Sequence, residues 1–212
     1  DCDAKVLIAS AALADTIASL GDAADNIELR LSVGGSLPGY EPLEEATAGQ
    51  PETASPQDAE GSWMFYSSGT TGQPKGIKPQ LPTIALGEVN PLVSLISGLY
   101  GIDTGSIYLS PAPLYHAAPA GWSTTVQRIG GTVVVMDRFD PLEWLRLVEE
   151  YRVTHTQVVP THLVRLLKLA ETTRARYDVS SLKMVVHAAA PCPPEVKRAA
   201  LDWLGLIVYE YY

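Results

Sequence analysis

The segment from Tyr66 to Gly76 constrains the fold of this chain more than any other. It reads Tyr-Ser-Ser-Gly-Thr-Thr-Gly-Gln-Pro-Lys-Gly and follows a short apolar run, Trp63 to Tyr66, that predicts a buried strand. Glycines and small hydroxyl side chains let backbone N–H groups approach an anion closely and add further donors. The P-loop motif is excluded because Lys75 is followed by glycine rather than by Ser or Thr. The segment predicts a phosphate-binding loop, with an ordinary Gly/Ser surface turn as the alternative.

The composition is that of an ordinary globular protein. The 212 residues are 46% hydrophobic and 18% charged, enough for a sizeable core in one or two domains. A formal net charge of −9 argues against nucleic acid as a partner, because a surface that binds nucleic acid collects positive charge. The apolar runs are far shorter than a membrane span, and the N-terminus lacks a secretory signal. We therefore expect no transmembrane segment. Since Cys2 and Cys192 form neither a disulfide framework nor a metal-ligand spacing, we also expect a reduced, cytoplasmic protein.

Short apolar runs alternate with longer amphipathic ones, which is the pattern of an α/β fold. The best-supported helix begins after Asp140, since Asp is a good N-cap and Pro141 suits the first helical position. Leu142, Leu145 and Val148 then share the face that packs on a sheet. The predicted strands are 5–9, 27–33, 63–67, 106–110, 132–136, 154–159, 183–187 and 206–210. The predicted helices are 11–20, 84–100, 120–129, 141–151, 161–170 and 194–204.

Two compositional breaks predict the domain organisation. Residues 34–61 are rich in Gly, Pro, Glu, Ala and Thr with few aliphatic side chains, which predicts a solvated linker. A weaker break at 101–105 separates a predicted helix from a new strand. We therefore expect a partial first subdomain, 1–102, that carries this linker and the loop 66–76, and a second subdomain, 103–212.

Two further stretches follow predicted strands of the second subdomain. Tyr115 and His116 come after the strand 106–110 and precede a run of small residues, where a histidine is often a hydrogen-bonded packing residue. Ala188 to Pro191 follow the strand 183–187, and a turn of alanines leaves backbone groups open to a planar ligand. The alternative for this turn is a tight loop packed for its own sake.

Together these stretches resemble the adenylate-forming superfamily of acyl-CoA synthetases, luciferases and peptide-synthetase adenylation domains, and most closely its fatty acyl-CoA synthetases. The resemblance rests on Tyr66 to Gly72, on Leu114-Tyr115-His116 and on Tyr209 to Tyr212. Further features at the family's spacing are Gly130-Gly131, Phe139-Asp140-Pro141, Val153-Thr154, Val159-Pro160-Thr161 and Ala189-Ala190-Pro191. The resemblance implies an α/β fold with parts of two stacked αβ subdomains of such an enzyme's N-terminal domain. Because the chain starts without Met and stops within an apolar β-run, we expect a fragment.

The resemblance implies an acid-thiol ligase. A carboxylate would attack the α-phosphorus of Mg-ATP to give an acyl-adenylate and pyrophosphate, and CoA would then displace AMP. A small-molecule carboxylic acid, ATP and CoA would be the partners, with Mg²⁺ as cofactor. Because a carboxylate is already nucleophilic at neutral pH, the protein would supply positioning and charge neutralisation.

The resemblance also assigns roles to three groups of residues. The ATP phosphates would be held by Ser67, Ser68, Gly69, Thr70, Thr71, Gly72 and Lys75. The adenine base would be bordered by Ala188, Ala189, Ala190, Pro191 and Tyr212, although the family's turn is usually richer in Gly. The acyl pocket or its gate would be formed by Tyr115, His116 and Trp122. The magnesium Glu, the ribose-binding Asp and the adenylating Lys would lie beyond Tyr212. We therefore expect no complete catalytic set and no metal ligand in this chain. The isolated chain is expected to be inactive.

Two alternatives remain open. A peptide-synthetase-type adenylation domain would activate an amino acid and would need an acidic side chain near the pocket entrance to pair with the substrate's ammonium group. The stretch 112–122 contains no Asp, which disfavours this alternative. The other alternative is a non-catalytic folded core with a vestigial phosphate loop.

Overall fold

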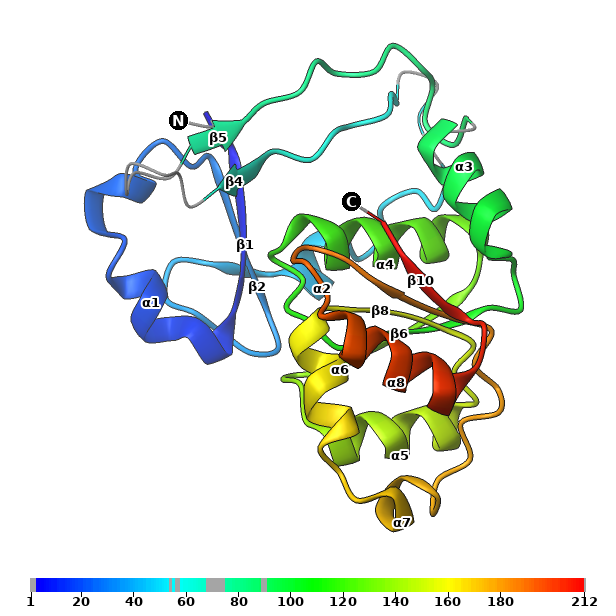
Figure 1. Cartoon of the computed structure of the whole chain (residues 1–212). Helices are drawn as coiled ribbons and strands as arrows, with labels where there is room; N and C mark the ends of the chain where they lie inside the picture. The colour runs from blue at the N-terminus through cyan, green and yellow to red at the C-terminus, as the bar shows by residue number, and fades with distance from the viewer. Residues whose placement is uncertain (1–2, 54, 56–57, 68–74, 89–90, 212) are drawn as a thin grey trace. The chain divides into compact units, whose positions relative to one another are not determined.

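The computed structural model describes residues 3–53, 55, 58–67, 75–88 and 91–211 (Figure 1). The chain forms two compact units, residues 1–88 and 89–212. Both units contain parallel sheets with helices between the strands, so the predicted α/β class is confirmed. Helix α3, Pro91–Tyr100, belongs to the second unit. The subdomain division near residue 103 stays a prediction.

The first unit is built on a small parallel sheet. Its strands are β1 (Val6–Ser10), β2 (Leu29–Val33) and β3 (Glu41–Pro42), in the order β1-β2-β3. Its helical segments are a 3₁₀ helix Ala11–Leu13, α1 (Ala14–Ala18), a 3₁₀ helix Gly21–Ala24 and α2 (Leu43–Thr47). Strand β3 and helix α2 lie inside the segment 34–61 that composition predicts to be a linker. Glu44 and Glu45 in the first turn of α2 favour this short helix, because negative charge is stabilising at a helix N-terminus.

The predicted phosphate loop connects two short antiparallel strands. Strand β4 (Phe65–Ser67) pairs with β5 (Lys75–Ile77), and Ser67 lies opposite Lys75. Trp63 is 54% exposed and Tyr66 is 47% exposed, so the prediction of a buried strand is wrong. A two-stranded ribbon buries little on either face, and the rings of Trp63 and Phe65 stack on each other instead, with centroids 5.8 Å apart.

The helix predicted at 84–100 is shorter in the structure. Helix α3 begins at Pro91, which suits a first helical position and disfavours helical backbone before it. Residues Ile84 and Leu86 instead bond to the segment before β4: Glu60 donates its N–H to the Ile84 carbonyl at 3.0 Å, and Leu86 donates to the Asp58 carbonyl at 3.2 Å. The sequence 84–88 therefore forms a bridge rather than a first helical turn.

The second unit contains a five-stranded, fully parallel sheet. Its strands are β6 (Ile107–Ser110), β7 (Thr132–Val135), β8 (His155–Val158), β9 (Met184–His187) and β10 (Val208–Glu210), in the order β10-β9-β8-β6-β7. The chain passes from β6 to its neighbour β7 and then crosses to β8 on the other side of β6. The winding direction thus reverses between β6 and β8. In parallel α/β sheets, ligands bind beyond the carboxyl ends of the strands at such a reversal.

Helices cover both faces of this sheet (Figure 1). The helices of this unit after α3 are α4 (Ala117–Ile129), α5 (Pro141–Tyr151), α6 (Pro160–Leu167), α7 (Glu171–Arg174) and α8 (Pro194–Leu204). Helix α4 lies on one face, and α5, α6 and α8 lie on the other. Right-handed crossovers on the two sides of the reversal account for this division.

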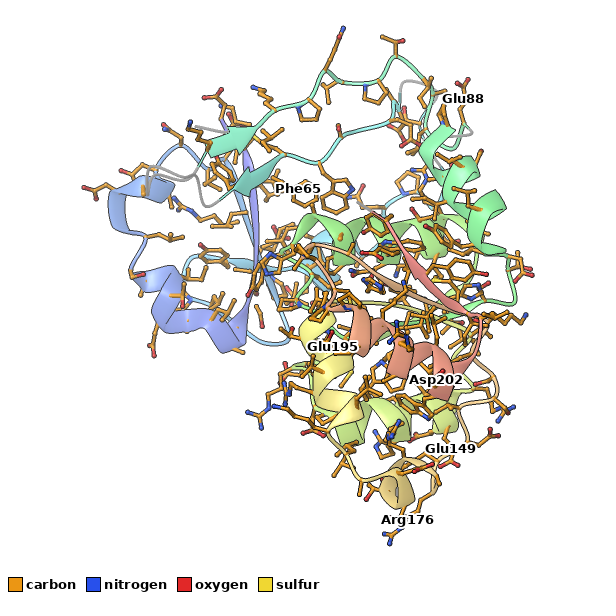
Figure 2. All side chains as sticks on the ribbon, in the orientation of Figure 1. Phe65, Glu88, Glu149, Arg176, Glu195 and Asp202 are labelled. Carbon is orange, nitrogen blue, oxygen red and sulfur yellow. The ribbon has the colours of Figure 1, made fainter. Side chains whose placement is uncertain are left out.

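Strand side chains alternate between the two cores that result. Leu109 and Val185 pack with α5, α6 and α8, whereas Tyr108 and Val186 pack with Trp122 of α4. Alternation is expected because successive side chains of a strand point to opposite faces. Charged side chains such as Glu149, Arg176 and Asp202 are exposed at the outside of the unit (Figure 2).

Helix α5 confirms the prediction made from its first residues. The Asp140 carboxylate oxygen Oδ1 accepts the backbone N–H groups of Leu142 and Glu143 at 2.9 and 3.0 Å. These bonds satisfy two donors that have no partner within the helix. Leu145 and Val148 are fully buried on the face toward the sheet, whereas Leu142 remains 43% exposed.

The pair Gly130-Gly131 joins α4 to β7. Gly130 ends the helix with φ at 92°, in the left-handed region where glycine is favoured. A side chain at Gly131 would place its Cβ 2.9 Å from the carbonyl oxygen of Ser106, the residue before β6, so this close approach requires glycine. In the described part of the chain, no helix has both the length and the apolar character needed to cross a membrane.

Candidate functional site

Two neighbouring cavities lie in the second unit. The turn cavity measures about 350 Å³ and is lined by Ala118, Ala188, Ala189, Ala190, Pro191 and Tyr211. The apolar cavity measures about 330 Å³ and is lined by Leu95, Ile96, Leu99, Tyr100, Ala117, Ala118, Gly121, Trp122, Thr125 and Tyr211. Ala118 and Tyr211 line both cavities. The loop that follows β9 and the segment that follows β10 thus place their residues at the carboxyl edge of the sheet.

The alanine turn, residues 188–191, has an unusual backbone. Ala188 is buried at the end of β9, and Ala189 has φ at 74°. Left-handed backbone costs a residue with a Cβ roughly 1–2 kcal/mol, and strain of this kind concentrates at functional sites. The turn keeps a conformation suited to glycine while it presents methyl groups to the cavity. The structure therefore brings together the four adjoining residues that the sequence assigns to the adenine base.

Three aromatic side chains form one wall of the apolar cavity. Trp122 is buried in α4 and donates its indole Nε1–H to the hydroxyl oxygen of Tyr211 at 3.3 Å. The ring of Tyr100 meets the Trp122 ring edge to face, with centroids 5.2 Å apart. Burial, and then the neighbouring Tyr211 and Tyr209, raise the pKa of the Tyr100 phenol, so this phenol is uncharged at neutral pH.

The predicted gate residues do not all reach this wall. Trp122 lines the apolar cavity, but Tyr115 and His116 are not in the described lining of either cavity. Tyr115 is 78% exposed, and its ring packs on His116 at 4.4 Å between centroids. His116 is the residue before α4, whose first residues Ala117 and Ala118 do line the apolar cavity. The gating role of Tyr115 and His116 stays a prediction.

The residues predicted to bind the ATP phosphates belong to the first unit. Ser68, Gly69, Thr70, Thr71 and Gly72 are outside the described residues, as is Tyr212 of the adenine set. Ser67 ends β4, and Lys75 begins β5 with an exposed side chain. A site shared by this loop and the two cavities therefore stays a prediction.

Sequence reasoning did not assign the residues of α3 or Tyr211 to the site. Leu95, Leu99 and Tyr100 come from α3 and line the apolar cavity. Leu95 and Leu99 are four residues apart and are both more than half exposed, so they form an apolar stripe that the helix leaves uncovered. This spacing was available in the sequence. The place of Tyr211 in both linings depends on the direction of its side chain after β10, which no pattern in the sequence reports.

Metal ligation has no candidate in the described part of the chain. Among those residues, no group of three or more His, Cys, Asp and Glu side chains lies close enough to hold a metal ion. Mg²⁺ prefers oxygen ligands in octahedral geometry, often with phosphates among them.

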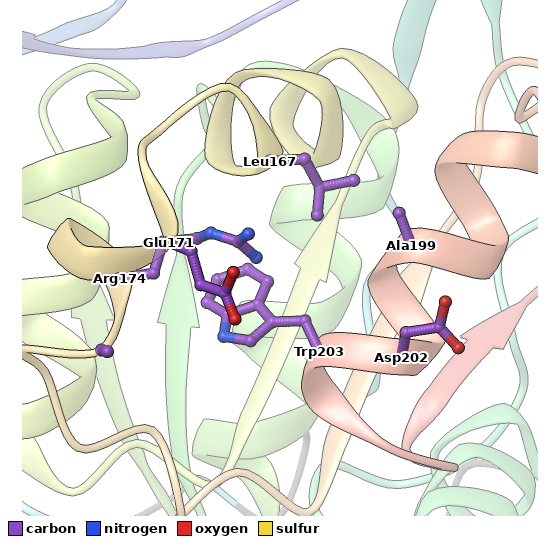
Figure 3. A pocket seen from close by; sticks show the side chains of 7 residues that line it. Leu167, Glu171, Arg174, Ala199, Asp202 and Trp203 are labelled. Carbon is purple, nitrogen blue, oxygen red and sulfur yellow. The ribbon is translucent and has the colours of Figure 1, made fainter.

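A broader hollow of about 550 Å³ lies among α6, α7 and α8 (Figure 3). The Arg174 guanidinium lies over the Trp203 ring at 4.7 Å from the centroid, and the carboxylates of Glu171 and Asp202 line the same hollow. Its lining, as far as the structure describes it, contains none of the residues that the sequence predicts for the site. The Arg174–Trp203 contact stabilises the helix pair, since a cation over an indole face is attracted by the ring.

The family model described as "AMP-binding enzyme" matches residues 1–212. The chain belongs to the AMP-binding enzyme family.

Several relatives are CoA ligases. The chain is 35% identical over 150 residues to a medium/long-chain-fatty-acid–CoA ligase of Mycobacterium tuberculosis, a match that covers 70% of this chain and 25% of the relative. It is 36% identical over 155 residues to 4-coumarate–CoA ligase 1 of Oryza sativa subsp. japonica, covering 69% of this chain and 26% of the relative. The chain thus spans about a quarter of the length of these relatives.

Solved structures share the fold. The amide bond synthetase McbA from Marinactinospora thermotolerans has a TM-score of 0.78 at 24% identity, over 98% of this chain and 40% of the other. The inhibitor-bound N-terminal domain of FACL13 from Mycobacterium tuberculosis has a TM-score of 0.78 at 22% identity, over 99% of this chain and 50% of the other. These likenesses confirm the predicted fold as that of adenylate-forming enzyme N-terminal domains.

Proposed function

We propose that the chain is part of an ATP-dependent acyl-CoA synthetase. The reaction joins a fatty acid to CoA through an acyl-adenylate and releases AMP and pyrophosphate. The observation that carries this proposal is the pair of neighbouring cavities, one apolar and one under the alanine turn, in a chain of the AMP-binding family. A ligand with a planar base and an apolar tail would fill both. Tyr211 would then lie where the two parts join.

The chain's own residues would bind and orient the reactants. The alanine turn and Tyr212 would border adenine, and the loop from Ser67 to Gly72 would hold the β- and γ-phosphates, with Lys75 nearby. Bound Mg²⁺ would neutralise phosphate charge, and its carboxylate ligand is expected beyond Tyr212. CoA would be the second substrate. A cytoplasmic location suits these soluble reactants.

The lining of the apolar cavity favours a fatty acid. Leu95, Ile96 and Leu99 offer hydrocarbon surface, and burying a methylene group is worth about 0.8 kcal/mol. The described lining contains no Asp or Glu. An amino acid would bring an ammonium group into this cavity without a charged partner there, which is costly. The fatty-acid–CoA ligase relative supports the same choice.

A second candidate substrate is an aromatic carboxylic acid. The rings of Tyr100, Trp122 and Tyr211 stand on one wall, and aromatic pairs in edge-to-face or offset geometry gain about 0.5–1.5 kcal/mol beyond burial. The 4-coumarate–CoA ligase relative is compatible with this candidate. An acid panel that contains both classes separates the two.

Tyr211→Ala should shift the enzyme toward longer acids. Removing the ring takes away the side chain that lines both cavities and so lengthens the apolar space. Two further buried methylene groups are worth about 1.6 kcal/mol, or roughly a tenfold gain in relative kcat/KM. The measurement is CoA-ester formation from a series of straight-chain acids, with the chain extended by the C-terminal part that its relatives possess.

Tyr211→Phe is the matched control, because it keeps the ring and removes only the hydroxyl that accepts from Trp122. We expect its acid preference to stay within a few-fold of the unsubstituted enzyme. Unchanged preference in Tyr211→Ala would show that the acyl chain lies elsewhere. A fall for 4-coumarate alone in the same variant would favour the aromatic acid.

Lys75→Met should weaken ATP binding. A hydrogen bond to a charged group contributes about 1.5–3 kcal/mol, so the dissociation constant is expected to rise roughly 10- to 100-fold. Isothermal titration of the chain with ATP measures this. Lys78→Met is the control, since Lys78 is also exposed and lies three residues further along. Equal losses in both variants would indicate general charge attraction rather than a phosphate site at Lys75.

A further inference from the structure

A buried histidine precedes the alanine turn and is held by two charged side chains. His187 is the last residue of β9, and its side chain is fully buried. Its Nε2 lies 2.7 Å from the Lys197 ammonium nitrogen on α8 and 3.8 Å from Oε2 of Glu210 on β10. Lys197 and Glu210 are themselves 3.7 Å apart. Three elements are thus joined at the edge of the sheet beside the turn cavity.

The contact with Lys197 fixes the proton on the imidazole ring. An ammonium group can only donate, so Nε2 of His187 accepts and the ring is neutral with its proton on Nδ1. Nδ1 is buried and has no hydrogen-bond partner among the described residues. Protonating the ring would place an imidazolium donor 2.7 Å from the ammonium nitrogen, where the two charges repel. The bond from Lys197 therefore exists only while His187 is neutral.

The backbone carries this contact to the turn cavity. Tyr211 donates its N–H to the His187 carbonyl at 3.3 Å, and Glu210 lies opposite His187 in the sheet. Ala188 follows His187 directly, and both Ala188 and Tyr211 line the cavity. His187 and Glu210 each directly precede a residue that lines the turn cavity. A shift of either side chain can therefore displace Ala188 or Tyr211.

The surroundings of His187 oppose its protonation. Burial lowers the pKa of the imidazole most, the ammonium of Lys197 lowers it further, and the carboxylate of Glu210 raises it. Cys192 lies near the same two charges, and burial raises the pKa of its thiol, so it stays uncharged at neutral pH. As pH falls through the His187 pKa, the Lys197 bond is lost and Glu210 becomes the partner of the charged ring.

We propose that Lys197 and neutral His187 act as a positioning pair that holds the alanine turn and Tyr211 in the geometry that accepts an adenine base. When His187 is protonated, its ring loses the hydrogen bond from Lys197 and pairs with Glu210 instead. This change moves Glu210, which is directly bonded to Tyr211 in the chain, and so weakens binding of the base. The inference rests on the proposed function, since it takes the turn cavity as the adenine site. It adds a pH dependence that comes from the protein rather than from phosphate ionisation.

The test compares two substitutions of opposite charge. In Lys197→Met the repulsion is gone and Glu210 remains, so the titration midpoint of His187 moves to higher pH. In Glu210→Gln the attraction is gone and Lys197 remains, so the midpoint moves to lower pH. Histidine ring NMR signals of the chain give the midpoints, and the Ala188 and Tyr211 amide signals should titrate with the same midpoints. Lys168→Met, at the residue directly after α6, is the control and should leave all of them unchanged.

Adenosine is the ligand for the binding arm, because it carries no phosphate that titrates in this range. Its affinity, measured from the Ala189 and Tyr211 amide shifts at pH values on both sides of the His187 midpoint, should fall severalfold below that midpoint and follow it in both variants. The inference would be overturned if the His187 midpoints of the two variants did not move in opposite directions. It would also be overturned if adenosine bound but its affinity did not change with pH around those midpoints. Absence of any adenosine effect in the unsubstituted chain would instead refute the adenine site, while the midpoints and amide titrations still test the positioning pair.

Discussion

ATP–pyrophosphate exchange by the 212-residue chain is expected to stay at background with every acid tested. The chain spans about a quarter of the length of its CoA-ligase relatives, and the resemblance places the magnesium carboxylate and the adenylating lysine beyond Tyr212. Each group that stabilises transition-state charge typically contributes about 10²–10³ in rate, so losing two costs at least about 10⁴-fold. Extending the chain by the C-terminal part that its relatives possess should restore exchange.

The assay needs a check that the shorter chain is folded and binds nucleotide. Far-UV circular dichroism and ATP titration supply it, because the parallel sheet and the turn cavity lie within the described residues. A folded, ATP-binding chain without exchange would match the expectation. Robust exchange by the chain alone would contradict it. The residues of this chain would then suffice for adenylation without the carboxylate and the lysine that are expected beyond Tyr212.

The sequence predicted the sheet of the second unit well because its signals are local and consistent. Each of its strands is a short run that contains at least one β-branched residue, and the helix after Asp140 has its cap, its proline and its apolar stripe in agreement. The first unit was harder. Strand β3 and helix α2 are short and lack an apolar period. The composition of residues 34–61 therefore predicted a linker where these two elements form.

The site was predictable to the extent that it follows strand ends. The turn after β9 and Trp122 on α4 were named from the sequence, and the structure places them on neighbouring cavities. Contacts between distant segments were not predictable. The bond from Lys197 to His187 depends on how α8 lies against β9, and the positive φ of Ala189 contradicts what an alanine alone indicates. Local preference was overridden there by the surrounding packing.

Leu145→Ala is expected to cost the second unit about 2–5 kcal/mol of unfolding free energy. Leu145 is fully buried on α5 in the core formed with α6 and α8, so truncation removes apolar contacts and leaves a cavity. Leu142→Ala on the same helix is the matched control, since this side chain is 43% exposed. A surface substitution of this kind costs within about 0.5 kcal/mol, apart from any loss of contact at the helix start.

Urea unfolding followed by tryptophan fluorescence measures the difference. Trp63→Phe in every variant removes the tryptophan of the first unit, so the signal comes from Trp122, Trp144 and Trp203 of the second. The midpoint should fall strongly for Leu145→Ala and little for Leu142→Ala, with similar slopes, because a change in midpoint at constant slope is a change in stability. Equal losses would mean that α5 does not present this face to the sheet. The sheet that carries the alanine turn would then have a different support, because α5 packs on the same face as α8, which follows that turn.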